Sequence, residues 1–76
     1  MMTKNQKIDH LDRALLNLQN VADRVHYHID SDPDYIALVK LATDWQCSYI
    51  RMNRDVRLNM ELLHRAVTNR VYAVGA

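Results

Sequence analysis

The stretch His26–Tyr35, which reads HYHIDSDPDY, decides the fold because it contains the clearest helix-start signal in the chain. Asp32 has the side chain of a good N-cap, and Pro33 suits the first helical position because an N–H would have no partner there. Asp34 then falls in the first turn, where the helix dipole favours an anion. We therefore interpret residues 30–34 as the corner between two antiparallel helices.

The same stretch also contains alternating aspartates that resemble the start of a calcium-binding loop, namely Asp30, Asp32 and Asp34. A calcium loop of that type needs glycine at its sixth position and glutamate at its twelfth, where this chain has Tyr35 and Leu41. His26 and His28 are two residues apart, so on a helix they point to different faces. We therefore expect a helical corner here and no metal.

Apolar residues on both sides of the corner follow helical spacing. The first set is Ile8, Leu11, Leu15, Leu18, Ala22, Val25 and Ile29. The second set is Tyr35, Leu38, Ala42, Trp45, Tyr49, Met52 and Val56, followed after a shift in register by Met60, Leu63, Val67, Val71 and Val74. They predict helices over residues 5–29 and 34–72, the second either continuous or broken near residues 53–55. No glycine or proline marks a break, so we favour one continuous helix.

The composition predicts an all-α protein with one domain over residues 1–76. One glycine and one proline among 76 residues leave little material for loops. Cys47 is the only cysteine, which excludes an internal disulfide and fits a reducing compartment. The N-terminus has no apolar core of a signal peptide, and no apolar run reaches membrane-spanning length. We expect a cytoplasmic protein without membrane contact.

The unequal lengths of the two predicted helices indicate self-association. Folded back on a continuous second helix, the first helix would end near Leu58. The apolar residues beyond that point would then face water, and we predict that they form an oligomer interface: Met60, Leu63, Val67 and Val71. A patch of that kind is covered in most proteins. The fold prediction is therefore a long antiparallel helical hairpin assembled into a homo-oligomeric bundle.

The sequence contains no constellation typical of an enzyme. A glycine-rich phosphate loop, a G-x-S-x-G nucleophile motif, an H-E-x-x-H zinc motif and a C-x-x-C pair are all absent. Cys47 has no base beside it, and His64 next to Arg65 fits an exposed ion-pairing histidine. We therefore expect no catalytic residues and no cofactor.

Three arginines fall within two turns of the second helix, namely Arg51, Arg54 and Arg57. They form either an ordinary charged face, with Glu61 one turn away, or a site for a bound anion, since the guanidinium group suits phosphate. Trp45 and Tyr49 are either core residues or partners for a bound base. A net charge of +1 argues against strong nucleic-acid binding.

Residues 10–67 resemble the helical-hairpin domain of phage anti-defence sponge proteins, which sequester the cyclic nucleotide signals of CBASS and Thoeris immunity. The resemblance lies in HLDRALLNLQNVADRVHYHIDSD, in WQCSYIRMN over residues 45–53, and in DVRLNMELLHRAV over residues 55–67. It implies a homo-oligomer with nucleotide pockets between subunits, phosphates on Arg or Lys, and bases on aromatic residues. The positions that fit these roles are Lys40, Trp45, Tyr49, Arg51, Arg54 and Arg57.

The resulting hypothesis is a non-enzymatic phage-type anti-defence protein that binds and sequesters a cyclic nucleotide or another phosphate-bearing immune signal. The alternative is a protein-binding helical hairpin: an adaptor, a secretion co-chaperone or a direct inhibitor of a host protein complex. Such a protein would use an apolar helix face to bind its partner. An enzyme has the weakest support, because no catalytic group is visible.

Overall fold

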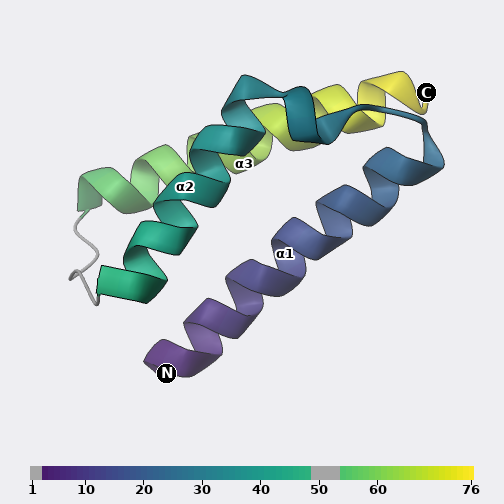
Figure 1. Ribbon diagram of the computed structural model, residues 1–76. Coiled ribbons are helices and arrows are strands. Elements are labelled where there is room, and N and C mark those ends of the chain that lie inside the picture. Colours follow the sequence, from purple (N-terminus) through teal and green to yellow (C-terminus); the bar gives the residue numbers. More distant parts are fainter. Residues whose placement is uncertain (1–2, 49–53) are drawn as a thin grey trace.

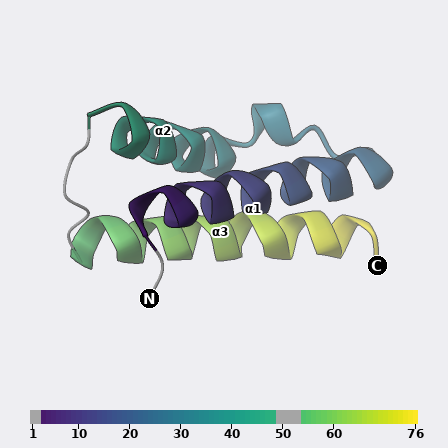
Figure 2. The ribbon, with the colours of Figure 1, turned by 90° about the horizontal axis from the view of Figure 1, so that it is seen from below.

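The computed structural model describes residues 3–48 and 54–76. Within these residues it contains three α-helices, α1 (Lys4–Arg24), α2 (Pro33–Ser48) and α3 (Arg54–Val74), and a 3-10 helix, η1 (Ile29–Ser31). The predicted all-α class is confirmed. The helices lie side by side in a molecule of 36 × 20 × 20 Å, and the chain reverses direction between α1 and α2 and again between α2 and α3 (Figures 1 and 2).

The second predicted helix is two helices, so the expectation of one continuous helix over residues 34–72 is wrong. α2 ends at Ser48 and α3 begins at Arg54, and α3 lies alongside α2 (Figure 1). The physical reason is burial: a continuous helix would leave the second apolar stripe exposed, whereas two shorter helices pack their stripes on each other. The shift in register near Val56 marked the change of helix.

The first helix is shorter than the predicted span of residues 5–29. It starts with a capping box, in which the Gln6 N–H donates to Thr3 Oγ1 at 3.2 Å and Gln6 Oε1 accepts from the Thr3 N–H. It ends at Arg24 because His26 adopts a left-handed conformation, with φ of 57°. The Tyr27 N–H then reaches back to the Ala22 carbonyl at 2.9 Å, which is the Schellman pattern of helix termination.

The start of α2 confirms the prediction made from DSDP. Pro33 is the first residue of the helix. Oδ1 of Asp32 accepts from the N–H of Asp34 at 2.9 Å and from the N–H of Tyr35 at 3.2 Å. Asp32 is therefore the N-cap, as its residue type and position indicated. The corner itself is longer than predicted, because the chain leaves α1 before reaching η1.

The core consists of two adjoining clusters that combine residues from all three α-helices. One cluster is formed by Leu18, Ala22, Ile29, Tyr35, Val67 and Val71, and the other by Leu38, Ala42 and Met60. All of these side chains belong to the predicted apolar stripes, so the stripes identified the core correctly. Gln19 and Gln46 add polar links between α1 and α2, through Tyr35 and Asp12 respectively.

The predicted overhang does not exist. Met60, Val67 and Val71 are buried within the single chain, and Leu63 is half-buried against the second core cluster. These side chains cannot also serve as the exposed interface that the sequence argument assigned to them. The error follows from the assumption of a continuous helix, since the stripe lies on α3, which turns back and packs these residues against α1 and α2. The homo-oligomeric state stays a prediction, and the apolar residues of the predicted interface no longer support it.

None of the helices in the described residues combines enough length with enough apolar character to cross a bilayer.

Candidate functional site

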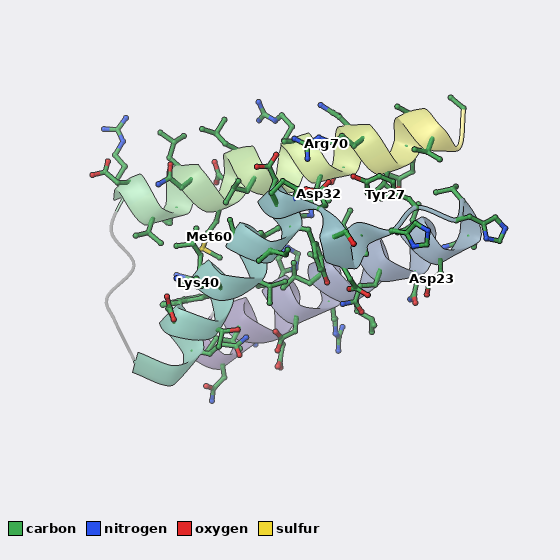
Figure 3. The ribbon with its side chains drawn as sticks, turned by 45° about the horizontal axis from the view of Figure 1, so that its top comes forward. Asp23, Tyr27, Asp32, Lys40, Met60 and Arg70 are labelled. Atoms are coloured by element: carbon green, nitrogen blue, oxygen red, sulfur yellow. The ribbon has the colours of Figure 1, made fainter. Side chains whose placement is uncertain are left out.

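The predicted ligand residues do not form one cluster. Tyr49 and Arg51 lie outside the described residues. Trp45 and Arg57 do come together, on the walls of a hollow between the helices. Lys40 and Arg54 are exposed on α2 and α3 respectively, and they line none of the hollows described below (Figure 3 for Lys40). Of the six predicted ligand positions, the structure therefore brings two together, Trp45 and Arg57.

The hollow that contains Trp45 and Arg57 has a volume of about 410 Å³. Its walls are formed by Lys7, His10, Leu11, Trp45, Arg57, Met60 and Glu61. Leu11 and Met60 give it an apolar floor, while Lys7, His10 and Arg57 put cationic or titratable groups at its rim. We call this hollow the tryptophan end. The hollow lies where α1, α2 and α3 meet.

Three further hollows continue from the tryptophan end along the line where α1 and α3 meet. The next has a volume of about 530 Å³ and shares His10, Leu11, Met60 and Glu61 with the first. The third shares Ala14, His64 and Thr68 with the second, and the fourth shares Val21 and Tyr72 with the third. The shared walls make the four hollows one continuous surface, which we call the α1–α3 groove.

Helical spacing explains how this groove forms. Lys7, His10 and Ala14 are three and four residues apart on α1, so they lie on one side of that helix. Arg57, Glu61 and His64 follow the same spacing on α3. On each helix, these residues lie beside the apolar stripe that faces the core. Sequence analysis missed Lys7 and His10, although their spacing beside the apolar stripe was a visible signal.

The charges of the groove are unbalanced and unpaired. Lys7, Arg57, Arg65 and Arg24 line it, and Glu61 is its one side-chain carboxylate among the residues the structure describes. Within the described part of the chain, the salt bridges all involve Arg70, which lies elsewhere. The expected ion pairs of Glu61 with Arg57 and Arg65 are therefore not formed. An anion that enters the groove would therefore meet cationic side chains that form no salt bridge within the described part of the chain.

Arg70 belongs to a separate polar cluster that fixes α3 to the start of α2. Its guanidinium donates to both oxygens of Asp32, at 2.8 and 2.9 Å, and to Asp34. The Tyr27 hydroxyl donates to Asp32 from the other side. Figure 3 shows Arg70, Asp32 and Tyr27 gathered between α3 and the corner. We call this cluster the Asp32 clamp.

The Asp32 side chain is 1 % exposed, and every bond in the clamp favours its charged form. Burial alone raises the pKa of Asp32, but hydrogen bonds from Tyr27, Arg70 and two backbone N–H groups outweigh burial and hold its pKa below the usual carboxyl value. The bond to Asp32 in turn raises the pKa of Tyr27, with burial adding to it. The buried carboxylate is thus fully satisfied by the protein, which identifies the clamp as structural.

The clamp also accounts for two of the three alternating aspartates of the opening stretch, Asp32 and Asp34. Both oxygens of Asp32 are occupied by protein donors, and Asp34 binds Arg70. Among the described residues, no three His, Cys, Asp or Glu side chains lie close enough together to hold a metal ion. These aspartates thus begin a helix and hold a guanidinium.

Comparison of this chain with protein-family models, with curated proteins and with solved structures gave no match. The resemblance to phage sponge proteins therefore stays a prediction that rests on the sequence pattern. What the chain binds has to be argued from the groove itself.

Proposed function

We propose that this chain is a non-enzymatic binding protein that holds a phosphate-bearing nucleotide at the tryptophan end of the α1–α3 groove. The observation that carries the proposal is the position of Trp45 in one hollow with Lys7 and Arg57. An aromatic face for a base and two cations for a phosphate are the groups that nucleotide recognition needs.

Each part of the hollow has a defined contribution to binding. The guanidinium of Arg57 offers paired donors that match two phosphate oxygens, and Lys7 adds a second positive charge from the facing helix. The half-buried indole of Trp45 presents a stacking surface at the same hollow. Because no salt bridge holds Arg57 in the described part of the chain, binding a phosphate breaks no existing ion pair.

The proposed biological role is sequestration of a cyclic nucleotide or related immune signal in the cytoplasm, by a phage-type anti-defence protein. It combines the anion-binding hollow with the sequence resemblance to sponge proteins. Sequestration requires tight binding and no chemistry, and the proposal gives Trp45, Lys7 and Arg57 binding roles alone. Self-assembly, which would place copies of the hollow near one another, is part of the same proposal.

The test is isothermal titration calorimetry with a panel of cyclic dinucleotides and ADP-ribose-type signals. We expect Arg57→Gln to weaken binding about tenfold or more, because a charge-assisted hydrogen bond contributes about 1.5–3 kcal/mol. Arg13→Gln is the matched control, since Arg13 is exposed on α1 and lines none of the four hollows. No heat across the panel, or equal losses in both variants, would remove this proposal.

A second candidate function is protein binding, as an adaptor, a secretion co-chaperone or an inhibitor of a host complex. The observation that favours it is the length of the α1–α3 groove. The tryptophan end accounts for one of four adjoining hollows, and the remaining three extend toward Tyr72 and Gly75.

A further inference from the structure

The α1–α3 groove is too long for a single nucleotide. Lys7 lines the first hollow and Arg24 lines the last, and both belong to α1. At about 1.5 Å per residue, the helix between them spans roughly 26 Å, or about five helical turns. An occupant that covers this whole surface is an extended segment of a macromolecule.

The walls of the groove suit the side chains of a packing helix. Ala14 and Thr68 face the same two middle hollows, and their short side chains leave the space between α1 and α3 open there. Leu11 and Val21 add apolar floor on either side of Ala14. α1 also packs less extensively on α3 than α2 does. A helix laid along this seam would place its apolar face on the floor, as in helix-in-groove recognition.

The charges that line the groove determine which side chains a docked helix needs on its flanks. Lys7 and Arg57 mark one end, Arg65 the middle and Arg24 the other end, against the single side-chain carboxylate of Glu61 among described lining residues. Arg65 and Arg24 form no salt bridge within the described part of the chain. Acidic side chains on both flanks would complement this row, while basic ones would be repelled.

We propose that the α1–α3 groove is the docking site for an amphipathic helix of a partner protein, with an apolar face of leucine-type residues and glutamate or aspartate on its flanks. The docked helix completes a four-helix arrangement around the existing core. This inference develops the protein-binding candidate and goes beyond the nucleotide proposal, since the docked helix covers all four hollows, including the three that a nucleotide at the tryptophan end leaves uncovered.

The test uses two synthetic peptides of about five helical turns, matching the length of the groove. Both carry leucine at helical spacing, one with glutamate and the other with lysine on the flanks, and binding is followed by fluorescence anisotropy. We expect the acidic peptide to bind at least about tenfold more tightly, because complementary charge adds to a shared apolar contact. Equal binding of the two peptides, or binding of neither, would overturn the inference.

Variants place the peptide on the groove. Arg65→Glu, in the second hollow, should weaken acidic-peptide binding about tenfold, and Arg13→Glu, with the same charge change outside the groove, should change it less than about twofold. Ala14→Trp should block the middle hollows, with circular dichroism confirming that the variant folds. If Arg65→Glu and Arg13→Glu weaken binding equally, the attraction is non-specific and the docking site is wrong.

The outcome is separate from that of the nucleotide proposal. Arg65 does not line the tryptophan end, so nucleotide titration of Arg65→Glu reports on the nucleotide site with that end intact. Nucleotide heat without preference for the acidic peptide leaves the nucleotide proposal standing and removes the docking inference. Peptide binding that depends on Arg65, without nucleotide heat, leaves the docking inference standing and removes the nucleotide proposal.

Discussion

Replacing Asp32 by alanine tests the central structural interpretation. The carboxylate caps α2 through the N–H groups of Asp34 and Tyr35, and it accepts from Tyr27 and Arg70 in a position that is 1 % exposed. Alanine removes all of these acceptors at once. The expected result is a folded but clearly less stable protein.

The magnitude follows from the bonds that are lost. Loss of an N-cap costs about 1 kcal/mol. Loss of the acceptor for the Tyr27 hydroxyl costs about 1 kcal/mol more, and the small cavity adds to this. Arg70 adds little, because its side chain is 44 % exposed and keeps its bond to Asp34. The sum of about 2–3 kcal/mol is large against the roughly 4–11 kcal/mol typical of 76 residues, and it lowers Tm by about 10–20 °C.

Urea denaturation followed by far-UV circular dichroism measures this loss near neutral pH. Asp32→Asn is the matched control, because asparagine is also a good N-cap and keeps the volume while removing the charge. Its loss should be the smaller of the two. A loss below about 1 kcal/mol for Asp32→Ala would refute the reasoning, since the cap alone accounts for that amount.

The remaining predictions concern pH, the core and the end of α1. Because the folded-state pKa of Asp32 lies below its ordinary value of 3.8, the stability that the Asp32 carboxylate contributes is present above pH 3.8. This stability is lost as the pH falls through the folded-state pKa. The acid titration of Asp32→Asn should therefore lack this part of the stability loss seen in the wild type. Leu38→Ala, at a fully buried position, should cost about 3 kcal/mol in urea denaturation, against less than about 1 kcal/mol for Leu62→Ala, which is 51 % exposed. His26→Gly should raise the free energy of unfolding by about 0.5–1 kcal/mol, because glycine accepts a φ of 57° without the Cβ penalty; a loss of stability would show that His26 makes a compensating contact.

The features that sequence analysis identified correctly are those set by local chemistry. The N-cap at Asp32 and the first helical position of Pro33 depend on neighbouring residues alone. The apolar stripes also held, since Leu18, Leu38 and Val67 are all buried as their spacing indicated. Periodicity reports which face of a helix is buried, and it does so whatever that face packs against.

The features that were missed depend on chain topology. Periodicity does not tell whether a stripe continues in one helix or resumes in another, so the two-helix solution for residues 33–74 was not favoured. His26 ended α1 without the glycine that usually marks such an end. Arg70 was not among the predicted site residues, because its partner Asp32 lies 38 residues away, a separation at which sequence pattern carries no pairing information. Lys7 and His10 joined Trp45 only once three helices were placed together.

The Asp32 clamp ties α2 to α3, so we expect these two helices to move together more than either moves with α1. One carboxylate both starts α2 and holds α3, so neither helix can move away from the other without also losing the anchor of the corner. α1 contributes no side chain to that anchor, and its packing on α3 is comparatively sparse. Opening fluctuations should therefore swing α1 rather than separate α2 from α3. Because α1 forms one wall of the groove, a swing of α1 would change the width of the surface on which we propose binding.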